Sequence, residues 1–299
     1  MSDPVETTAL TKRYGRILAV DGLDLTVRPG EVYGFLGPNG AGKTTTLRML
    51  LGLIQPTSGG VRLLGRPPGP GHLDRVGALI EGPAFYPYLS GRNNLRVLAS
   101  HAGVARSRVD EVLGTVNLTD RSGDRYATYS LGMKQRLGLA AALLKDPEVL
   151  ILDEPTNGLD PAGMAGMRGT IRQLAAGGCT VLLSSHLLGE VQQICDRVGV
   201  ISRGRLVTET TVAELGSGGT LRIVADPVGE AHGLIASLVG GDRVRADGHA
   251  LDVDVDVSQA GRLNAELVCS GVTVRELRWR EPDLEQIFLE LTEGHSHVG

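Results

Sequence analysis

The chain has 299 residues, enough for about two domains that each bury a hydrophobic core. Hydrophobic residues make up 41% and charged residues 21% of the sequence, a balance that excludes an intrinsically disordered protein. The formal net charge of −4 shows none of the overall basic character that nucleic-acid binding favours.

No segment is predicted to direct secretion or to span a membrane. The first 15 residues contain no apolar stretch like that of a signal peptide. No apolar run approaches the roughly 18 to 20 residues that cross a bilayer, so a role at a membrane would need another chain to span it.

The cysteines, Cys179, Cys195 and Cys269, are widely spaced and form no C-x-x-C pair. They predict buried free thiols in a reducing compartment, and neither a disulfide framework nor a zinc site.

The N-terminal segment predicts strands. Residues 7–27 hold two short stretches of alternating apolar residues around Gly15 and Gly22, which is typical of antiparallel strands. Residues 32–36 (VYGFL) predict a short buried strand, and residues 45–53 predict a helix.

The segment between this strand and this helix, residues 37–45, reads GPNGAGKTT and fits the phosphate-loop pattern G-x-x-x-x-G-K-[ST]. Glycines let such a loop bend and bring backbone N–H groups close to a phosphate, and the start of the helix adds partial positive charge. Lys43 is expected to reach the β- and γ-phosphates of ATP, and the Thr44 hydroxyl to bind Mg²⁺. The predicted nucleotide-binding residues of the loop are Gly37, Pro38, Asn39, Gly40, Ala41, Gly42, Lys43, Thr44 and Thr45.

Downstream, strand patterns alternate with helix patterns. This context matters, because 42 glycines would let the four fixed positions match by accident in roughly one such chain in twenty or fewer. Strands are predicted at residues 61–64, 76–80, 149–152, 180–184, 198–201 and 205–208, and helices at 89–102, 106–116, 133–144, 163–177 and 187–196. The alternation predicts an α/β fold with a mainly parallel sheet.

The C-terminal part has a different pattern. Residues 216–219 (GSGG) predict a linker. Beyond it, strand and helix patterns follow in β-α-β-β-α-β order, which predicts a small α+β ferredoxin-like domain. Residues 283–291 predict a final amphipathic helix. The predicted domains are residues 1–215, with a helical subdomain at about residues 84–145, and residues 220–299.

Two carboxylates follow the apolar strand at residues 149–152. In phosphate-loop enzymes a buried strand that ends in a carboxylate beside the loop holds Mg²⁺, and Asp153 is predicted in that role. Glu154 is predicted to polarise the attacking water, since a positioned carboxylate suits a general base. The alternative is an acidic turn at the end of a strand, which is common.

Taken together, these motifs resemble the nucleotide-binding subunit of an ABC transporter over about residues 5–214. The resemblance rests on the phosphate loop and the Asp153–Glu154 pair, and on segments similar to the family's signature (usually LSGGQ), D-loop and switch histidine: YSLGMKQ at residues 129–135, GLD at 158–160 and SSH at 184–186. It implies a P-loop NTPase cassette with a mixed sheet core, a helical subdomain and an antiparallel β subdomain.

The resemblance also implies how ATP is used. Two copies pair head to tail, and each ATP lies between the phosphate loop of one copy and the signature of the other. Ser130 and Gly132 lie just before the predicted helix at residues 133–144, so that its N-terminus can face the γ-phosphate. His186 is implied to bond that phosphate, although read alone it would be an ordinary strand-end histidine. Tyr14 is implied to stack on adenine, the alternative being a surface tyrosine in a turn.

The sequence departs from the family pattern in its signature. Leu131 stands where the family usually has its first glycine, and Met133 stands where it has glutamine. Gly132 keeps a close backbone approach possible. Leu131 is expected to narrow that approach or to slow turnover.

A second departure is Glu81, which stands at the family's lid glutamine. Carboxylates are good Mg²⁺ ligands, so Glu81 is predicted as a metal ligand beside Thr44 and Asp153. Its negative charge near a triphosphate would alter the local electrostatics. The alternative is a solvated glutamate at the end of a strand.

Two further segments narrow the resemblance. Residues 81–89 (EGPAFYPYL) are similar to the lid of exporters for bacitracin and lantibiotics, and residues 281–291 are similar to the tail of daunorubicin-type cassettes. The aromatic residues Phe85, Tyr86 and Tyr88 predict either a groove for a permease helix or a satellite core. The chain is therefore expected to be the ATPase subunit that powers export of a drug or peptide antibiotic through an ABC-2-type permease, bound peripherally at the cytoplasmic face of the membrane.

Two other functions fit the sequence less well. A soluble cassette ATPase acting on nucleic acid or ribosomes usually has two cassettes, zinc sites or coiled-coil insertions, and this chain has one cassette, no zinc spacing and a mild negative charge. No nucleic-acid partner is therefore expected. A nucleotide-binding regulator without turnover is disfavoured, since Lys43, Asp153, Glu154 and His186 are all present.

Overall fold

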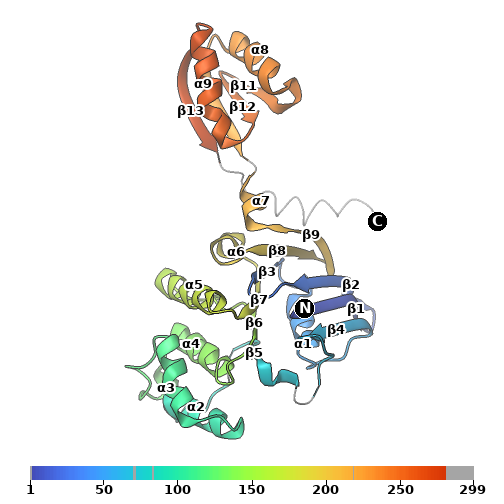
Figure 1. The fold of residues 1–299 in the computed structure, drawn as a ribbon, viewed down its shortest axis with the longest axis vertical. Helices are drawn as coiled ribbons and strands as arrows, with labels where there is room; N and C mark the ends of the chain where they lie inside the picture. Colours follow the sequence, from blue (N-terminus) through green and yellow to red (C-terminus); the bar gives the residue numbers. More distant parts are fainter. Residues whose placement is uncertain (1, 70–71, 83, 218, 281–299) are drawn as a thin grey trace. The chain divides into compact units, whose positions relative to one another are not determined.

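The computed structural model describes residues 2–69, 72–82, 84–217 and 219–280 (Figure 1). The chain forms two compact units, residues 1–210 and 211–299. Within the described residues, no helix has both the length and the apolar character needed to cross a membrane.

A mainly parallel sheet organises the first unit. In spatial order its strands are β5 (Val76–Leu79), β6 (Val149–Asp153), β7 (Thr180–Ser185), β3 (Val32–Leu36), β8 (Arg197–Ser202) and β9 (Arg205–Thr211). The first five of these run parallel, as the alternating pattern predicted. Arg203 and Gly204, with φ of 49° and 80°, form the two-residue turn that folds β9 back beside β8.

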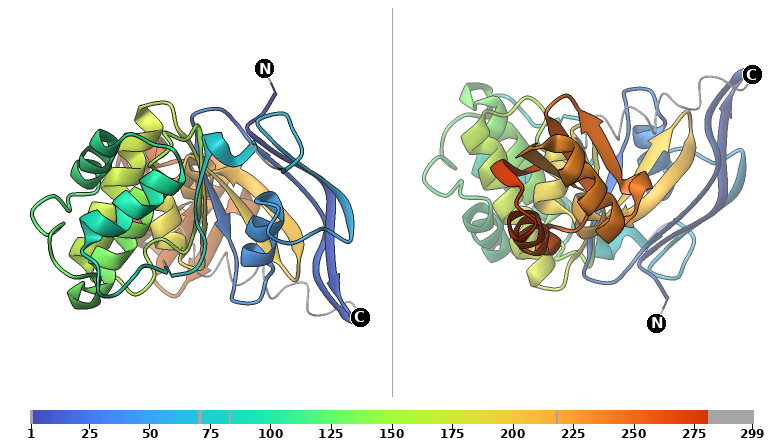
Figure 2. Two further views of the ribbon diagram at one scale, coloured as in Figure 1. Left: turned by 90° about the horizontal axis from the view of Figure 1, so that it is seen from below. Right: turned by 90° about the horizontal axis from the view of Figure 1, so that it is seen from above.

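A second, antiparallel sheet lies beside the first. Its strands are β2 (Ile17–Val27), β1 (Val5–Tyr14) and β4 (Ser58–Leu63), in that order. Helix α1 (Lys43–Leu50) contacts β2, β4 and β6 and lies between the two sheets (Figure 2). The fully buried side chains of Tyr33, Phe35, Leu47 and Leu50 belong to the core that joins these layers. This core fixes the start of α1 against the end of β3.

The remaining helices of this unit form two groups. Helices α5 (Pro161–Ala176) and α6 (Leu188–Ile194) pack against β7, and α6 also contacts β3. A Cβ atom on Gly34 would lie 2.7 Å from Val191 Cγ1, so only glycine lets α6 approach β3 this closely. Helices α2 (Gly91–His101), α3 (Arg106–Thr115) and α4 (Leu131–Ala142) contact one another, and all lie within the predicted helical segment (Figure 1).

The second unit has its own sheet and core. Its elements are α7 (Val212–Ser217), β10 (Thr220–Asp226), α8 (Val228–Val239), β11 (Val244–Asp247), β12 (Ala250–Asp254), α9 (Ala260–Cys269) and β13 (Thr273–Arg280). The strands pair antiparallel in the order β11-β12-β10-β13. Helices α8 and α9 pack against one face of this sheet. The buried side chains on that face include Leu221, Ile223, Leu251 and Val253.

Some boundaries differ from the predictions, mostly because local caps were missed. Helix α4 begins at Leu131 and not at residue 133, because Ser130 Oγ accepts a hydrogen bond from the Met133 N–H at 3.3 Å. Gly132 therefore lies in the first turn of α4, where the prediction placed it before the helix. Helix α1 begins at Lys43, two residues before the predicted start at residue 45.

The predicted linker at residues 216–219 is partly helical. Thr211 and Glu214 cap the start of α7 reciprocally: Thr211 Oγ1 accepts from the Glu214 N–H at 3.1 Å, and Glu214 Oε2 accepts from the Thr211 N–H at 3.0 Å. The capped helix runs to Ser217 and so takes in the first half of the predicted linker. The predicted helix at residues 283–291 lies outside the described residues.

The prediction of buried thiols holds for one cysteine and is wrong for another. Cys195 is buried, and burial raises its pKa. Cys179 is half-buried, and burial, with a smaller contribution from Asp146, raises its pKa to about 11. Cys269 is exposed, because it follows the buried Leu267 of α9 by two positions and so points away from the core.

Candidate functional site

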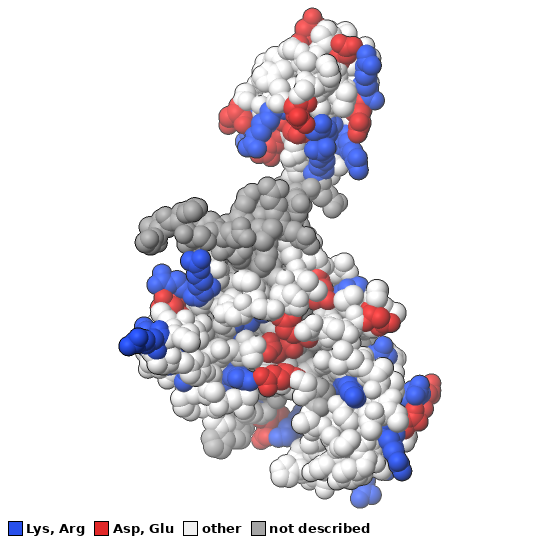
Figure 3. Space-filling view, turned by 180° about the vertical axis from the view of Figure 1, so that it is seen from behind, with Lys and Arg blue, Asp and Glu red and all other residues white. Residues whose placement is uncertain are grey.

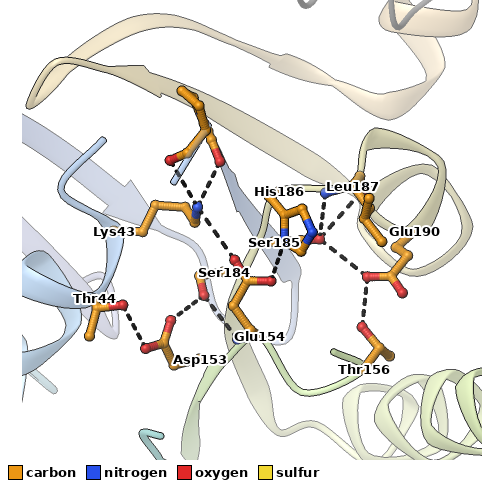
Figure 4. Close-up of polar contacts among 12 residues, drawn as sticks. Lys43, Thr44, Asp153, Glu154, Thr156, Ser184, Ser185, His186, Leu187 and Glu190 are labelled. Carbon is orange, nitrogen blue, oxygen red and sulfur yellow. Dashed lines mark hydrogen bonds and ion pairs between the residues drawn. The ribbon is translucent and has the colours of Figure 1, made fainter. Parts of the chain in front are cut away.

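The predicted catalytic residues meet where the central strands end. Strands β6, β7 and β3 are parallel neighbours, with Asp153 beside Ser184 and Ser185 beside Leu36. Their carboxyl ends therefore deliver three loops to one edge of the sheet, the position where open α/β sheets bind ligands. Figure 4 shows side chains from these loops in mutual contact.

The phosphate loop has the conformation that its glycines permit. A Cβ atom on Gly37 would lie 2.4 Å from the Ile201 carbonyl oxygen, and one on Gly42 would lie 2.4 Å from the Ala19 carbonyl oxygen. Gly40 and Gly42 have φ of 80° and 108°, and no atom lies within 4 Å of a Cβ built on Gly40. The loop is thus pressed against β8 and β2 at two glycines, while the third leaves room for close approach to the backbone.

Lys43 is held at the centre of the site. Its side chain is 6% exposed, and its Nζ donates to the carbonyl oxygens of Gly37 at 2.6 Å and Pro38 at 3.2 Å. The same Nζ lies 3.4 Å from Glu154 Oε1. The ammonium is thus fixed beside the phosphate loop, where a bound phosphate would compete with Glu154 and the two carbonyl oxygens for its charge.

Hydroxyl and carboxylate oxygen atoms beside Lys43 are connected by hydrogen bonds. The Thr44 hydroxyl donates to Asp153 Oδ2 at 2.8 Å, and the Ser184 hydroxyl donates to Asp153 Oδ1 at 2.5 Å (Figure 4). Hydroxyl and carboxylate oxygens are hard ligands of the kind that Mg²⁺ prefers, and Mg²⁺ is commonly held by one or two such groups together with substrate phosphates. Thr44 and Asp153 fit that requirement.

Glu154 contacts two of the predicted catalytic groups. Its Oε2 lies 2.6 Å from His186 Nδ1, and its Oε1 faces Lys43. A hydrogen bond to the carboxylate places the proton of a neutral His186 ring on Nδ1, which leaves Nε2 as an acceptor. The backbone of Glu154 has φ of 49°, unusual for a residue with a side chain, and its N–H donates to Ser184 Oγ at 3.0 Å. Such strained backbone is concentrated at functional sites.

Sequence reasoning missed a second carboxylate close by. Glu190 of α6 is 8% exposed, and its Oε2 accepts from Thr156 Oγ1 at 2.6 Å and from Ser185 Oγ at 3.2 Å. The signal was available, because Glu190 lies four residues before the buried Ile194 and so on the buried face of the helix.

The remaining predicted residues have other contacts. Tyr14 is 47% exposed, with Lys12 Nζ 5.0 Å from its ring centroid. Glu81 forms an ion pair with Arg48 of α1, a partner the sequence analysis did not identify. Among the described residues, Ser130 and Gly132 make no polar contact with Lys43, Thr44, Asp153, Glu154 or His186.

The signature leucine packs on the D-loop of the same chain. A Cβ atom on Gly158 would lie 2.7 Å from Leu131 Cδ2, and a Cβ atom on Gly132 would lie 3.6 Å from Leu159 Cδ2. Leu131 nonetheless remains 50% exposed. The bulk of Leu131 is therefore accommodated by the missing side chain of Gly158, and part of its surface stays open to solvent.

Exposed aromatic side chains and a groove lie near the start of the helical group. Tyr86 and Tyr88 are 51% and 67% exposed, with ring centroids 5.7 Å apart, whereas Phe85 packs edge-on against Tyr126 at 5.2 Å. A groove lies along α2, lined by Leu89, Asn93, Arg96, Val97, Ser100 and His101. Of the two alternatives for these aromatics, satellite core therefore fits Phe85, and an open surface fits the two tyrosines.

Comparison with known proteins gives a consistent result. A family model described as "ABC transporter" matches residues 20–157. The bacitracin transport ATP-binding protein BcrA of Bacillus licheniformis is 41% identical over 98% of this chain and 99% of its own length. The daunorubicin resistance ATP-binding protein DrrA3 of Streptomyces coeruleorubidus is 40% identical over 94% of this chain and 93% of its own.

Solved structures show the same likeness over about seven tenths of the chain. The structure of an ATP-binding subunit of an ABC transporter has a TM-score of 0.64 and 28% identity, covering 71% of this chain and 91% of that chain. The structure of cbiO1 from Clostridium perfringens, part of an ABC transporter complex, has a TM-score of 0.66 and 26% identity, covering 72% of this chain and 91% of that chain.

Proposed function

The chain belongs to the ABC transporter family of ATP-binding proteins, and from that premise we propose that it is the ATP-hydrolysing subunit of an exporter for a drug or peptide antibiotic. One observation carries the catalytic part of the proposal: Glu154 lies between His186 at 2.6 Å and Lys43 at 3.4 Å, beside the Thr44–Asp153 pair. The names of the relatives support the cargo class, since they refer to bacitracin transport and to daunorubicin resistance.

We assign the following roles to the residues of the site. The backbone of residues 37–45 and the Lys43 ammonium bind the ATP phosphates. Thr44 and Asp153 hold Mg²⁺, which when bound neutralises phosphate charge. Glu154 accepts a proton from the attacking water. His186, oriented by that carboxylate through Nδ1, donates to the γ-phosphate from Nε2 when its ring carries a proton on both nitrogens.

Two predicted contacts with the nucleotide lie outside the central cluster. Tyr14 offers an exposed ring for stacking on adenine, and Lys12 backs that ring. We keep Glu81 as a proposed Mg²⁺ ligand. Its ion pair with Arg48 offsets the negative charge that a glutamate adds near the triphosphate.

We further propose that two copies pair head to tail to complete each site. Ser130 caps α4 and Gly132 lies in its first turn, so the start of a 12-residue helix is available to the γ-phosphate bound by the other copy.

We propose a domain division that follows the two units. Residues 1–215 form the nucleotide-binding cassette and residues 220–299 an accessory domain. The strand order β11-β12-β10-β13 and the β-α-β-β-α-β succession support a ferredoxin-like fold for the accessory domain.

The membrane partner is proposed to be an ABC-2-type permease at the cytoplasmic face of the membrane. The exposed rings of Tyr86 and Tyr88, and the groove along α2, whose lining mixes Leu89 and Val97 with polar side chains, offer a surface for a permease helix. On the face shown in Figure 3, acidic and basic side chains of the described residues are interspersed, with no continuous basic surface for nucleic acid. Neither that face nor the names of the relatives favour the soluble nucleic-acid or ribosome alternative.

Tyr88→Asp is expected to separate the two halves of this proposal. A charge at this exposed aromatic position, which a docked permease helix would bury, should displace the chain from membranes that contain its permease, while phosphate release from Mg-ATP by the purified chain stays within about twofold of the unmodified rate. Membrane fractionation and a phosphate-release assay measure the two effects. Leu53→Asp, at another apolar position that is 62% exposed, is the matched control and should stay membrane-bound.

Different results would contradict the ATPase assignment and the docking surface. No phosphate release by the unmodified chain would contradict the ATPase assignment. Full retention of Tyr88→Asp in the membrane fraction would contradict docking at the exposed tyrosines and leave the ATPase assignment intact.

A further inference from the structure

Glu190 occupies an unusual position for a carboxylate. It lies on α6, outside the loops that carry the catalytic residues, and is 8% exposed. One of its oxygen atoms, Oε2, accepts hydrogen bonds from two hydroxyls on two different loops, those of Thr156 at 2.6 Å and Ser185 at 3.2 Å. Hydrogen bonds to an ionised acceptor are the stronger kind, and burial strengthens them further.

The two hydroxyls belong to the segments that carry Glu154 and His186. Thr156 follows Glu154 by two residues, in a turn closed by the hydrogen bond from the Asn157 N–H to the Glu154 carbonyl oxygen at 3.1 Å. Ser185 directly precedes His186, and its Oγ also accepts from the Leu187 N–H at 3.0 Å. The backbone on both sides of His186 is thus fixed through Ser185.

These contacts close a ring around the reactive pair. From Glu190 one branch runs through Thr156 to Glu154, and the other runs through Ser185 to His186; the ring closes where Glu154 Oε2 meets His186 Nδ1 at 2.6 Å (Figure 4). Moving either loop relative to the other would lengthen that contact. Misplacement of a catalytic group by about 1 Å can cost on the order of 100-fold in rate.

We propose that Glu190 is a positioning residue for ATP hydrolysis, which holds the Glu154 loop and the His186 loop at the separation that their contact needs. The inference rests on the proposed ATPase function. It assigns Glu190 no contact with ATP, so its loss should affect the rate of the chemical step and not the binding of substrate.

The test compares Glu190→Leu with Glu190→Gln. Leucine removes the acceptor at similar volume, whereas the glutamine carbonyl oxygen can accept both hydroxyl bonds. Phosphate release should give a kcat about 10- to 100-fold lower for Glu190→Leu, with KM for ATP within about twofold, and a kcat within about threefold of the unmodified chain for Glu190→Gln. Gln193→Leu, at an exposed position of the same helix, is the matched control and should leave kcat unchanged.

A double-mutant cycle separates positioning from general destabilisation. Thr156→Val removes one donor, and its loss of kcat should overlap with that of Glu190→Leu, so that the double variant loses less than the product of the two single losses. Should Glu190→Leu fail to fold, Thr156→Val and Ser185→Ala test the two branches, and each is expected to lower kcat with KM unchanged.

Two results would overturn the proposal. One is a kcat for Glu190→Leu, or for both hydroxyl variants, equal to that of Gln193→Leu; the other is a rise in KM with kcat unchanged. In either case the unmodified chain would still hydrolyse ATP, whereas no hydrolysis by the unmodified chain would instead contradict the proposed function itself.

Discussion

Glu154→Gln is expected to lower the turnover of ATP by about 100- to 10,000-fold, the range typical of losing a general base. Glutamine keeps the size of the side chain and an acceptor for His186 Nδ1, but its amide cannot take a proton from water at neutral pH. ATP binding should persist within a few-fold, because the phosphate contacts assigned to residues 37–45 are untouched. Phosphate release measures turnover, and titration calorimetry measures binding.

The matched control for this variant lies next to the other end of the same strand. Glu148 immediately precedes β6 and forms an ion pair with Arg75 at the surface, so Glu148→Gln should leave turnover within about twofold. Retention of more than about a tenth of the unmodified rate by Glu154→Gln would contradict the assignment of the base.

Lys43→Met is expected to act on binding. An ammonium about 4 Å from a phosphate charge at an effective dielectric of about 20 contributes up to about 4 kcal/mol, and screening and desolvation reduce this to about 2–4 kcal/mol. ATP affinity should therefore fall by roughly 30- to 1000-fold. Methionine retains most of the length of the buried stem, so the loop keeps its packing.

The control here is a second lysine in the same unit. Lys145 is half-exposed and pairs with Asp74, and Lys145→Met should bind ATP as the unmodified chain does. Equal ATP affinity for Lys43→Met and Lys145→Met, measured by calorimetry, would remove Lys43 from the phosphate site.

The fold and the centre of the site were accessible from sequence for different physical reasons. Buried parallel strands are short uninterrupted apolar runs, so residues 32–36 and 149–152 stood out, and their parallel pairing brought the loops after them together. The phosphate loop was recognisable because sterics allow only glycine at positions 37 and 42.

The boundaries were less accessible, because they depend on single hydrogen bonds. The starts of α4 and α7 are set by the Ser130 cap and by the Thr211–Glu214 pair. The sequence pattern placed the first of these starts two residues late, and it predicted a linker at residues 216–219 but no helix before it. Because of the Ser130 cap, Gly132 lies within the helix and not before it. The exposure of Cys269 depends on the side of α9 from which its side chain projects. The prediction of buried thiols used only the number and spacing of the cysteines, which do not reveal that side.

The partners of the site residues were the least predictable part. Arg48 and Glu81 lie 33 residues apart, and Thr156 and Glu190 lie 34 residues apart, so only the folded chain pairs them. Periodicity could place Glu190 on a buried face, but no spacing rule identifies the hydroxyls that it accepts from. A motif specifies which atoms meet a ligand, whereas the contacts that hold those atoms depend on the packing of α6 on the sheet.

The central claim, that each ATP is hydrolysed between the phosphate loop of one copy and the signature of another, is tested most directly by mixing two inactive variants. Lys43→Met disables the loop and keeps the signature, whereas Gly132→Asp places a negative charge in the first turn of α4 and keeps the loop. In a mixed pair, one of the two sites combines an intact loop with an intact signature. Phosphate release by an equal mixture should therefore return to roughly a quarter of the unmodified rate, although each variant alone is inactive. A mixture as inactive as its components, or full turnover by Gly132→Asp alone, would contradict the claim.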